Sequence, residues 1–143
     1  MADELLANPL QVDVLEELYL AGHQIPSIPA QVLLGNMPSL VRLNIIGGDI
    51  NKKICLDLST GEVCPRLRFI RLGVDMTVVA TVLDMIESRQ DRAKSSVHLN
   101  RGITPFEVAH ITTWGGCHIW DCVQRASRIA EKKDVKIFMY LDE

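Results

Sequence analysis

The stretch RLRFIRLGVDMTVVATVLDMIESR, Arg66–Arg89, changes its hydrophobic period in the middle. In its first part, Ile70 and Leu72 fall on one side of an extended chain. Phe69 and Arg71 fall on the other side. The second part has the i, i+3, i+4, i+7 spacing of a half-buried helix, made by Val79, Val82, Leu83 and Ile86. The sequence therefore predicts one β-strand followed directly by one helix.

The beginning of this strand repeats a leucine spacing that occurs twice earlier in the chain. Three triplets, 25 and then 27 residues apart, have the form L-x-x-L-x-L: Leu15, Leu18 and Leu20; Leu40, Leu43 and Ile45; Leu67, Ile70 and Leu72. A degenerate fourth copy begins at Lys94 and places Val97 and Leu99 at its last two positions. A fifth strand is predicted at Val135–Leu141, where apolar residues alternate strictly. Repeats at such a period indicate a solenoid.

The segments between the strands are predicted to return as helices or irregular chain. Gln31–Leu34, ending at Gly35, predicts a short helix. The return from Gly47 to Pro65 is compatible with a turn of helix or with a short extended piece. After the fourth strand, the segment TPFE from Thr104 to Glu107 has an N-cap, a proline at the first helical position and an acidic residue at the third. It predicts a helix that ends near Trp114.

A second helix is predicted immediately after the first, in the same return. Its apolar face is the clearest in the chain and consists of Ile119, Cys122, Val123, Ala126, Ile129 and Ala130. We therefore expect two helices between the fourth and the fifth strand.

Parallel strands joined by helices need crossovers, and such crossovers are almost always right-handed. The pattern resembles the leucine-rich repeat family, whose unit reads L-x-x-L-x-L-x-x-N/C-x-L. The resemblance implies an α/β fold, a short right-handed solenoid of about five parallel strands with helices on its convex side. We expect a single domain over residues 1–143, with an N-terminal cap at 1–13, repeats at 14–102, and the helical return and final strand at 103–143. The asparagine position of the repeat is occupied by His23, Gly48, Asp75 and Gly102.

Two short segments carry a second resemblance. Cys64-Pro65-Arg66-Leu67 opens a repeat, and Ile86-Glu87-Ser88-Arg89 closes its helix. This pairing is similar to the leucine-rich C-terminal half of F-box-type proteins of mushroom-forming fungi, and it implies a role in presenting substrates to a ubiquitin ligase. No F-box pattern precedes the repeats in this sequence, so we do not expect these residues to include the part that docks to the ligase.

Composition limits the classes of partner. The chain has 143 residues, a net charge of −3 and 48% hydrophobic residues, which suit one globular domain. A nucleic-acid groove needs a concentrated basic field, so nucleic acid is not an expected partner. No apolar stretch is long enough to span a membrane, and the N-terminus lacks a secretory signal. The expected compartment is the cytoplasm, while export without a signal peptide stays open.

Cysteine and histidine spacing gives little support to metal binding or catalysis. The four cysteines, Cys55, Cys64, Cys117 and Cys122, contain no C-x-x-C pair. Cys117, His118 and Cys122 form one cluster of metal-ligand types, but Cys122 lies on an apolar helix face, where a thiol behaves as a small core residue. No common catalytic motif is present, and His110 is expected to be half-buried. We expect no enzyme activity, no metal and no cofactor.

The concave face of such a sheet is the predicted binding surface. One row of side chains would hold Glu17, Arg42, Phe69, Ser96 and Lys136, and a second would hold Tyr19, Asn44, Arg71, His98 and Phe138, with Tyr140 beyond. Aromatic residues and arginine are favoured at protein interfaces. The expected function is non-catalytic protein binding through Tyr19, Arg42, Asn44, Phe69, Arg71, His98 and Phe138.

Three alternatives stay open at the level of sequence. Phe69 and Phe138 are also compatible with a surface that neighbouring chain or a second copy covers. The strand at Leu15–Leu20 lies at an open end of the sheet, and a homodimer through that edge is a further expectation. Finally, a free-standing fungal effector or immunomodulatory protein, acting on glycans or innate-immune receptors, is the alternative function.

Overall fold

The computed structural model describes residues 16–21, 34–35, 37–46, 50, 52–95, 102–114 and 119–142. The predicted N-terminal cap at 1–13 lies outside the described residues, as does most of the predicted helix that ends at Gly35.

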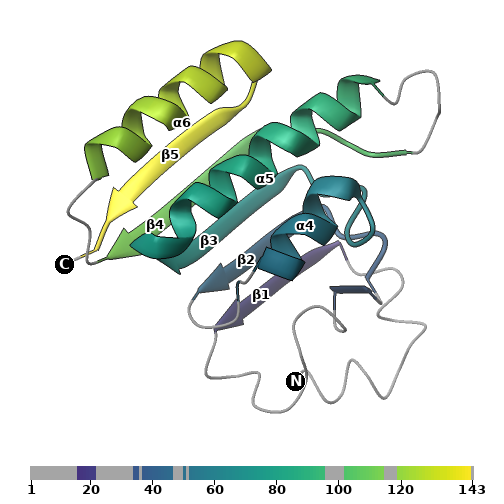
Figure 1. The fold of residues 1–143 in the computed structure, drawn as a ribbon. Coiled ribbons are helices and arrows are strands. Elements are labelled where there is room, and N and C mark those ends of the chain that lie inside the picture. The colour runs from purple at the N-terminus through teal and green to yellow at the C-terminus, as the bar shows by residue number, and fades with distance from the viewer. Residues whose placement is uncertain are drawn as a thin grey trace.

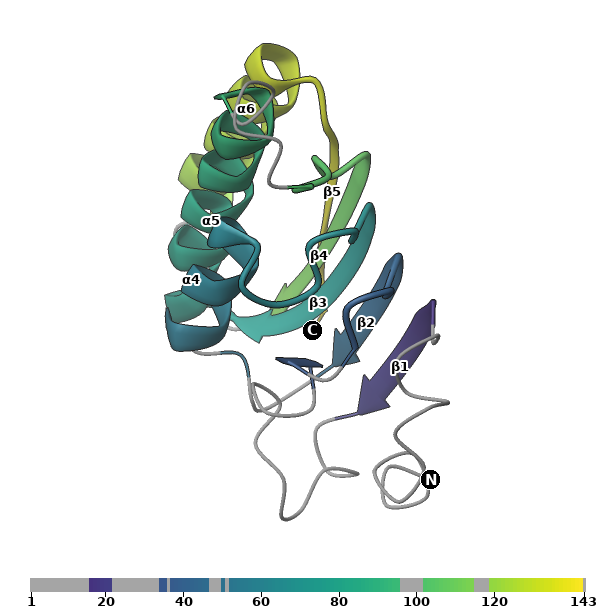
Figure 2. The same cartoon turned by 90° about the vertical axis from the view of Figure 1, so that its right-hand side faces the viewer.

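Five parallel strands form one sheet in sequence order, β1-β2-β3-β4-β5. The strands are β1 (Glu17–Ala21), β2 (Arg42–Ile46), β3 (Phe69–Asp75), β4 (Val108–Trp114) and β5 (Lys136–Leu141). The helices α4 (Lys52–Thr60), α5 (Met76–Ser95) and α6 (Ile119–Lys133) lie side by side and cover one face of the sheet (Figures 1 and 2). The predicted α/β solenoid of five parallel strands with helices on one side is confirmed. Among the described residues, no helix is both long and apolar enough to cross a bilayer.

The leucine spacing sets the register of the sheet. Leu43 pairs with Ile70, and Ile45 pairs with Leu72. All four side chains are buried beneath the helices. Because equivalent repeat positions lie side by side, the inward side chains of neighbouring strands stack into continuous apolar rows that form the core.

The fourth strand of the sheet is Val108–Trp114, so two sequence predictions are wrong. The strand predicted at Val97–Leu99 is not the neighbour of β3, and those residues lie outside the described part. The helix predicted from Thr104 does not form, because long-range hydrogen bonds hold that segment extended. The Thr104 N–H donates to the Pro65 carbonyl (2.8 Å), and the Phe106 N–H donates to the Gln90 side chain (2.7 Å).

The helices predicted from the apolar faces at Val79–Ile86 and at Ile119–Ala130 agree with the structure. α5 buries Val79, Val82, Leu83 and Ile86, the residues that predicted it. Asp75 caps its N-terminus, with a carboxylate oxygen 2.9 Å from the Thr77 N–H. The return from Gly47 to Pro65, left open by the sequence, contains α4. Helix α6 lies where its apolar face predicted, and it buries Ala126 and Ile129.

Among the described residues, Arg89 is the largest side chain that is fully buried, with 0% of its surface exposed. Its guanidinium donates to five backbone carbonyls, those of Leu58, Cys64, Pro65, Leu67 and Thr104, at 2.7–3.1 Å. It also lies 4.6 Å from the centre of the Phe106 ring. Burial lowers the pKa of Arg89 to about 10, which leaves the group charged at neutral pH. One side chain therefore joins the end of α4, the turn before β3 and the segment before β4.

The neighbouring Gln90 completes this junction. Its amide nitrogen donates to the carbonyls of Phe106 (3.1 Å) and Lys133 (3.2 Å), the latter in the last turn of α6. Its amide oxygen accepts from the Phe106 N–H. Arg89 and Gln90, in the C-terminal half of α5, thus connect the end of α4 with the end of α6.

Replacement of Arg89 tests this junction. We expect Arg89→Met to lower the free energy of unfolding by about 3 kcal/mol or more, because several buried carbonyls lose a charged donor at once. Arg89→Lys should restore only part of the loss, since an ammonium group lacks the planar fork. The control is Arg92→Met, at an exposed position of the same helix, with a change within about 0.5 kcal/mol. Urea unfolding followed by circular dichroism measures all three, and equal effects of Arg89→Met and Arg92→Met would contradict the assignment.

Candidate binding face

The face of the sheet opposite the helices, called here the open face, carries the outward side chains of the strands. Strand pairing places them in two rows in register. The first row is Glu17, Arg42, Phe69, Val108 and Lys136, and the second row is Tyr19, Asn44, Arg71, His110 and Phe138. Six of the seven residues predicted as a binding set lie in these rows.

His98, the seventh, was predicted to stand between Arg71 and Phe138 in the second row. His110 has that position, because β4 pairs Arg71 with His110 and His110 with Phe138. His98 itself lies outside the described residues, and Val108 stands where Ser96 was expected in the first row. The alternation of Ala109, Ile111 and Thr113, all buried, was the sequence signal for this strand, and the capping pattern at Thr104 concealed it.

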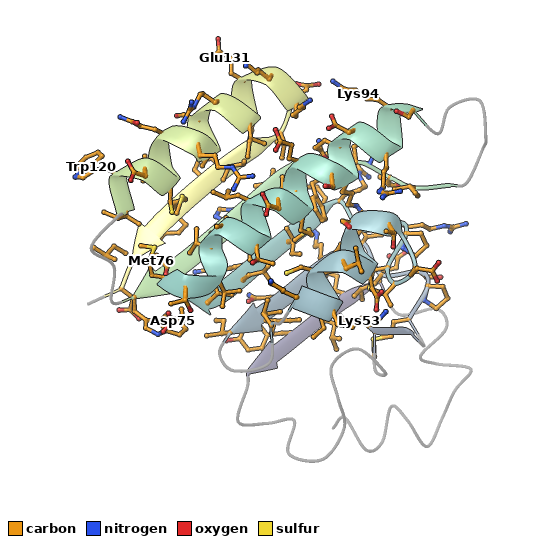
Figure 3. The ribbon with its side chains drawn as sticks, in the orientation of Figure 1. Lys53, Asp75, Met76, Lys94, Trp120 and Glu131 are labelled. Carbon is orange, nitrogen blue, oxygen red and sulfur yellow. The ribbon has the colours of Figure 1, made fainter. Side chains whose placement is uncertain are left out.

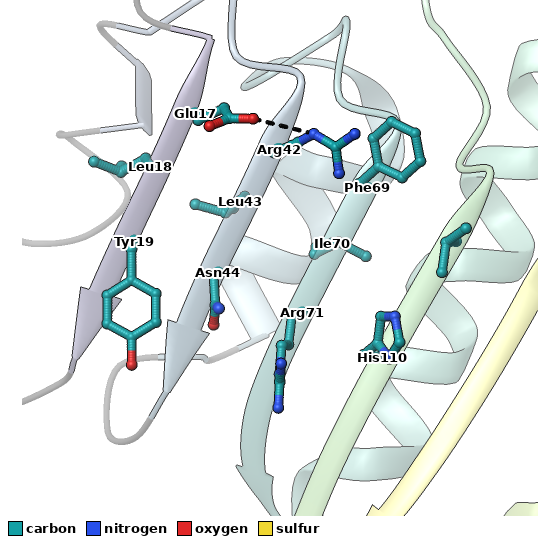
Figure 4. Close-up of a pocket in the computed structure, with 11 residues that line it drawn as sticks. Glu17, Leu18, Tyr19, Arg42, Leu43, Asn44, Phe69, Ile70, Arg71 and His110 are labelled. Carbon is teal, nitrogen blue, oxygen red and sulfur yellow. Dashed lines mark ion pairs between the residues drawn. The ribbon is translucent and has the colours of Figure 1, made fainter.

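A groove of about 650 Å³ lies on the open face over strands β1 to β4 (Figure 4). Its floor is the sheet, and Tyr19, Asn44, Arg71 and His110 project from successive strands along it. The Tyr19 side chain is 60% exposed. Because the groove is open to solvent along the sheet and bordered by aromatic and cationic side chains, it suits a chain segment or protein surface more than a small enclosed ligand.

At one end of the groove, two arginine side chains lie against the Phe69 ring and pair with carboxylates. The Arg42 Nε atom lies 3.1 Å from the Glu17 carboxylate, and its guanidinium carbon lies 4.0 Å above the centre of the Phe69 ring (Figure 4). A second guanidinium, that of Arg68, lies 5.5 Å from the same ring and pairs with Glu107. Cation–π contact and the ion pair hold Arg42 in place and compensate part of its charge.

The middle of the groove offers polar groups without partners among the described residues. The Asn44 Oδ1 atom is buried and accepts no hydrogen bond there. Arg71 is exposed and makes no ion pair with a described carboxylate. The exposed Arg71 guanidinium could bind a carboxylate of a ligand, whereas the buried Asn44 oxygen is not accessible from the groove.

Three stacked rings, called here the aromatic cluster, form the other end of the open face. His110 stacks on Phe138 with centroids 5.0 Å apart, and on Tyr140 with centroids 5.7 Å apart. The His110 Nδ1 atom lies 3.1 Å from the Tyr140 hydroxyl, within hydrogen-bond distance. Phe138 and Tyr140 both stay exposed, so the cluster offers a rigid apolar surface with a polar rim.

His110 is biased toward its neutral form. Partial burial lowers the pKa of His110 below its ordinary 6.5, and the positive charge of Arg71 lowers it further. At pH 7 the second row therefore presents one fixed cation, Arg71, beside a neutral imidazole.

The thiols of the described core are not reactive groups. Burial raises the pKa of Cys55 to about 11 and that of Cys64 to about 12, so neither thiol ionises at neutral pH. Cys122 is half-buried and packs against the core, as its helix face predicted. Cys117 and His118, the other members of the cysteine-histidine cluster, lie outside the described residues. Within the part of the chain that is described, no three metal-ligand side chains come together.

The coupling between Arg71 and His110 can be measured directly. We expect Arg71→Ala to raise the pKa of His110 toward 6.5, because a positive charge beside the imidazole is removed. Arg71→Lys keeps the charge and should leave the pKa close to that of the native chain. NMR titration of the histidine ring protons gives the three values, with His110→Gln assigning the resonance. An unchanged pKa in Arg71→Ala would show that the charge does not act on this ring.

Comparisons with protein-family models, with curated proteins and with solved structures found no match for this chain. The open face and its side chains are therefore the basis for a proposal about function.

Proposed function

We propose that the chain is a non-catalytic binding module of the leucine-rich-repeat type whose open face binds a protein partner. The observation that carries this proposal is the second row, in which five strands place Tyr19, Asn44, Arg71, His110 and Phe138 side by side on a face that no described helix covers. Tyrosine and arginine are prominent among the side chains that dominate protein interfaces.

The repeat type is supported by the way in which the two resembling segments meet. The Arg89 guanidinium at the end of one segment donates to the carbonyls of Cys64, Pro65 and Leu67 in the other. The two segments that carried the second resemblance are thus one structural unit, in which Arg89 of the helix satisfies the carbonyl groups of the turn that opens the same repeat. A role as substrate adaptor of a ubiquitin ligase is a narrower hypothesis and is not needed for this proposal.

Charge on the open face favours a partner that carries carboxylates. Arg42, Arg71 and Lys136 are positive and Glu17 is negative, so the two rows carry a charge of +2 on a chain whose net charge is −3. Arg71 is the cation that lacks a described carboxylate partner and lies inside the groove. We propose that it binds an aspartate or glutamate side chain of the partner, while Tyr19 and the aromatic cluster contact apolar residues.

Matched surface variants test this function. The test variant is Tyr19→Ala with Arg71→Ala, and the control is Leu56→Ala with Arg128→Ala on the helix side, where Leu56 is 55% exposed. Both remove one large exposed side chain and one arginine. Partners captured from an extract of the source organism are identified by mass spectrometry, and their affinities for the purified chains are then measured. We expect the test variant to lose about 30-fold or more in affinity, the effect of one or two interface hot spots.

The outcomes separate the candidate functions. A protein captured by the native chain and the control but lost by the test variant supports the proposal, and its affinity should fall as salt rises. Equal capture by both variants would place the binding surface elsewhere. If a glycan array binds the native chain and no protein is captured, the partner class is wrong, and the alternative of a glycan-directed effector is favoured.

A further inference from the structure

Strand β5 is the last strand of the sheet and has one neighbour, β4, among the described residues. The Lys136 N–H donates to the Glu107 carbonyl, and the Asp142 N–H donates to the Thr113 carbonyl, so both groups point toward β4. Backbone groups alternate in direction along a parallel strand. The N–H and C=O groups of Ile137, Met139 and Leu141 therefore point away from the sheet, along an edge that no described strand pairs with.

We propose that this edge pairs with the same edge of a second copy of the chain, in antiparallel orientation, with Met139 on the twofold axis. This pairing places Ile137 opposite the partner's Leu141, and Leu141 opposite the partner's Ile137. Each of the three residues with outward backbone groups then faces a partner residue whose backbone groups also point outward. Directly opposed residues in such a ladder exchange two hydrogen bonds, so the whole outward edge between Ile137 and Leu141 is satisfied.

Side chains on the open face agree with the same register. Lys136 falls opposite the partner's Asp142, and Phe138 falls opposite the partner's Tyr140. An ion pair and an aromatic pair are both favourable directly across antiparallel strands, and the symmetry forms each of them twice. Lys136 and Asp142 are exposed, and neither makes an ion pair with another described residue. One register therefore satisfies both the backbone groups and the side-chain pairs. This favours a second copy of the chain over an unrelated strand as the partner of β5.

Two large apolar side chains are exposed on the helix side of this edge. Leu141 is 49% exposed, and Trp120 at the beginning of α6 is 74% exposed. Arg125 fixes the rotation of α6, because its guanidinium pairs with Asp84 and Glu87 of α5. Trp120 is five residues earlier, about 140° round the helix at 100° per residue, so it lies on the side away from α5. Figure 3 shows its ring projecting beyond the body of the protein. The proposed dimer would cover this side chain.

The dimer would also join the two binding faces. A twofold axis perpendicular to the sheet leaves both open faces on the same side, and it brings the two aromatic clusters together at the centre. A partner with two binding segments would then be held by both copies at once, which raises its apparent affinity. This inference does not depend on the proposed function, because it rests on the edge of the sheet rather than on the groove.

The test is a charge exchange at the proposed contact, read by sedimentation and by light scattering. The native chain should change from a mass of 16.0 kDa to twice that mass as its concentration rises. Lys136→Glu and Asp142→Lys each place like charges opposite one another twice per dimer, so each should weaken dimerisation about tenfold. The double variant restores opposite charges and should return to within about threefold of the native affinity.

Two further variants complete the design. Leu141→Pro removes an outward N–H and no bond to β4, so it should weaken the dimer without unfolding the chain. Lys52→Glu makes the same charge change as Lys136→Glu on α4, at the other end of the molecule, and should not affect dimerisation. Thermal unfolding followed by circular dichroism verifies that each variant is folded.

Three results would overturn the proposal. A native chain that stays at 16.0 kDa at concentrations of order 100 μM does not form this dimer in solution. A dimer that none of the β5 variants weakens uses another surface. A double variant as weak as either single variant shows that Lys136 and Asp142 are not opposed. The two proposals can fail separately. If the native chain dimerises through β5 but captures no protein, the groove proposal fails. If it captures a protein through the groove but stays a monomer, the edge proposal fails.

Discussion

The buried guanidinium of Arg89 is the interaction on which the arrangement of the repeats depends. Helix ends and tight turns leave carbonyl groups without partners, and this fold brings several of them together in its interior. Arg89 donates to five carbonyls from three different segments. Such a charge is stable in the interior only where its hydrogen bonds are complete, so it fixes the positions of the segments relative to one another. Gln90 extends the junction to the end of α6.

The register that follows from this arrangement creates the open face. Each repeat starts its strand at an equivalent position, so outward side chains lie beside one another in rows across the sheet. Cation–π contact fixes Arg42 at one end, and ring stacking fixes His110 at the other. The polar residues Asn44 and Arg71 lie between these two rigid ends. Binding at the ends costs little conformational entropy, because their side chains are already held in place.

In the fourth repeat, the segment from Thr104 is extended although its local sequence predicts a helix. The TPFE segment has the residues of a helix start: threonine as N-cap, proline at the first helical position and glutamate at the third. In the folded chain, Gln90 binds both backbone groups of Phe106, and the Pro65 carbonyl accepts from Thr104. These bonds join residues far apart in sequence, and no local pattern encodes them. The consequence for the site is direct, because β4 brings His110 instead of His98 beside Arg71.

The sequence by itself determined the parallel α/β class, the positions of β2, β3, α5, α6 and β5, and most of the open-face rows, because hydrophobic period and repeat spacing are local properties of the chain. It also placed Phe69 and Arg71 on the face away from the core. Tertiary structure alone decided the fourth strand, the identity of the histidine in the second row and the role of Arg89. Each of these depends on hydrogen bonds between distant segments, which exist only once the core has brought those segments together.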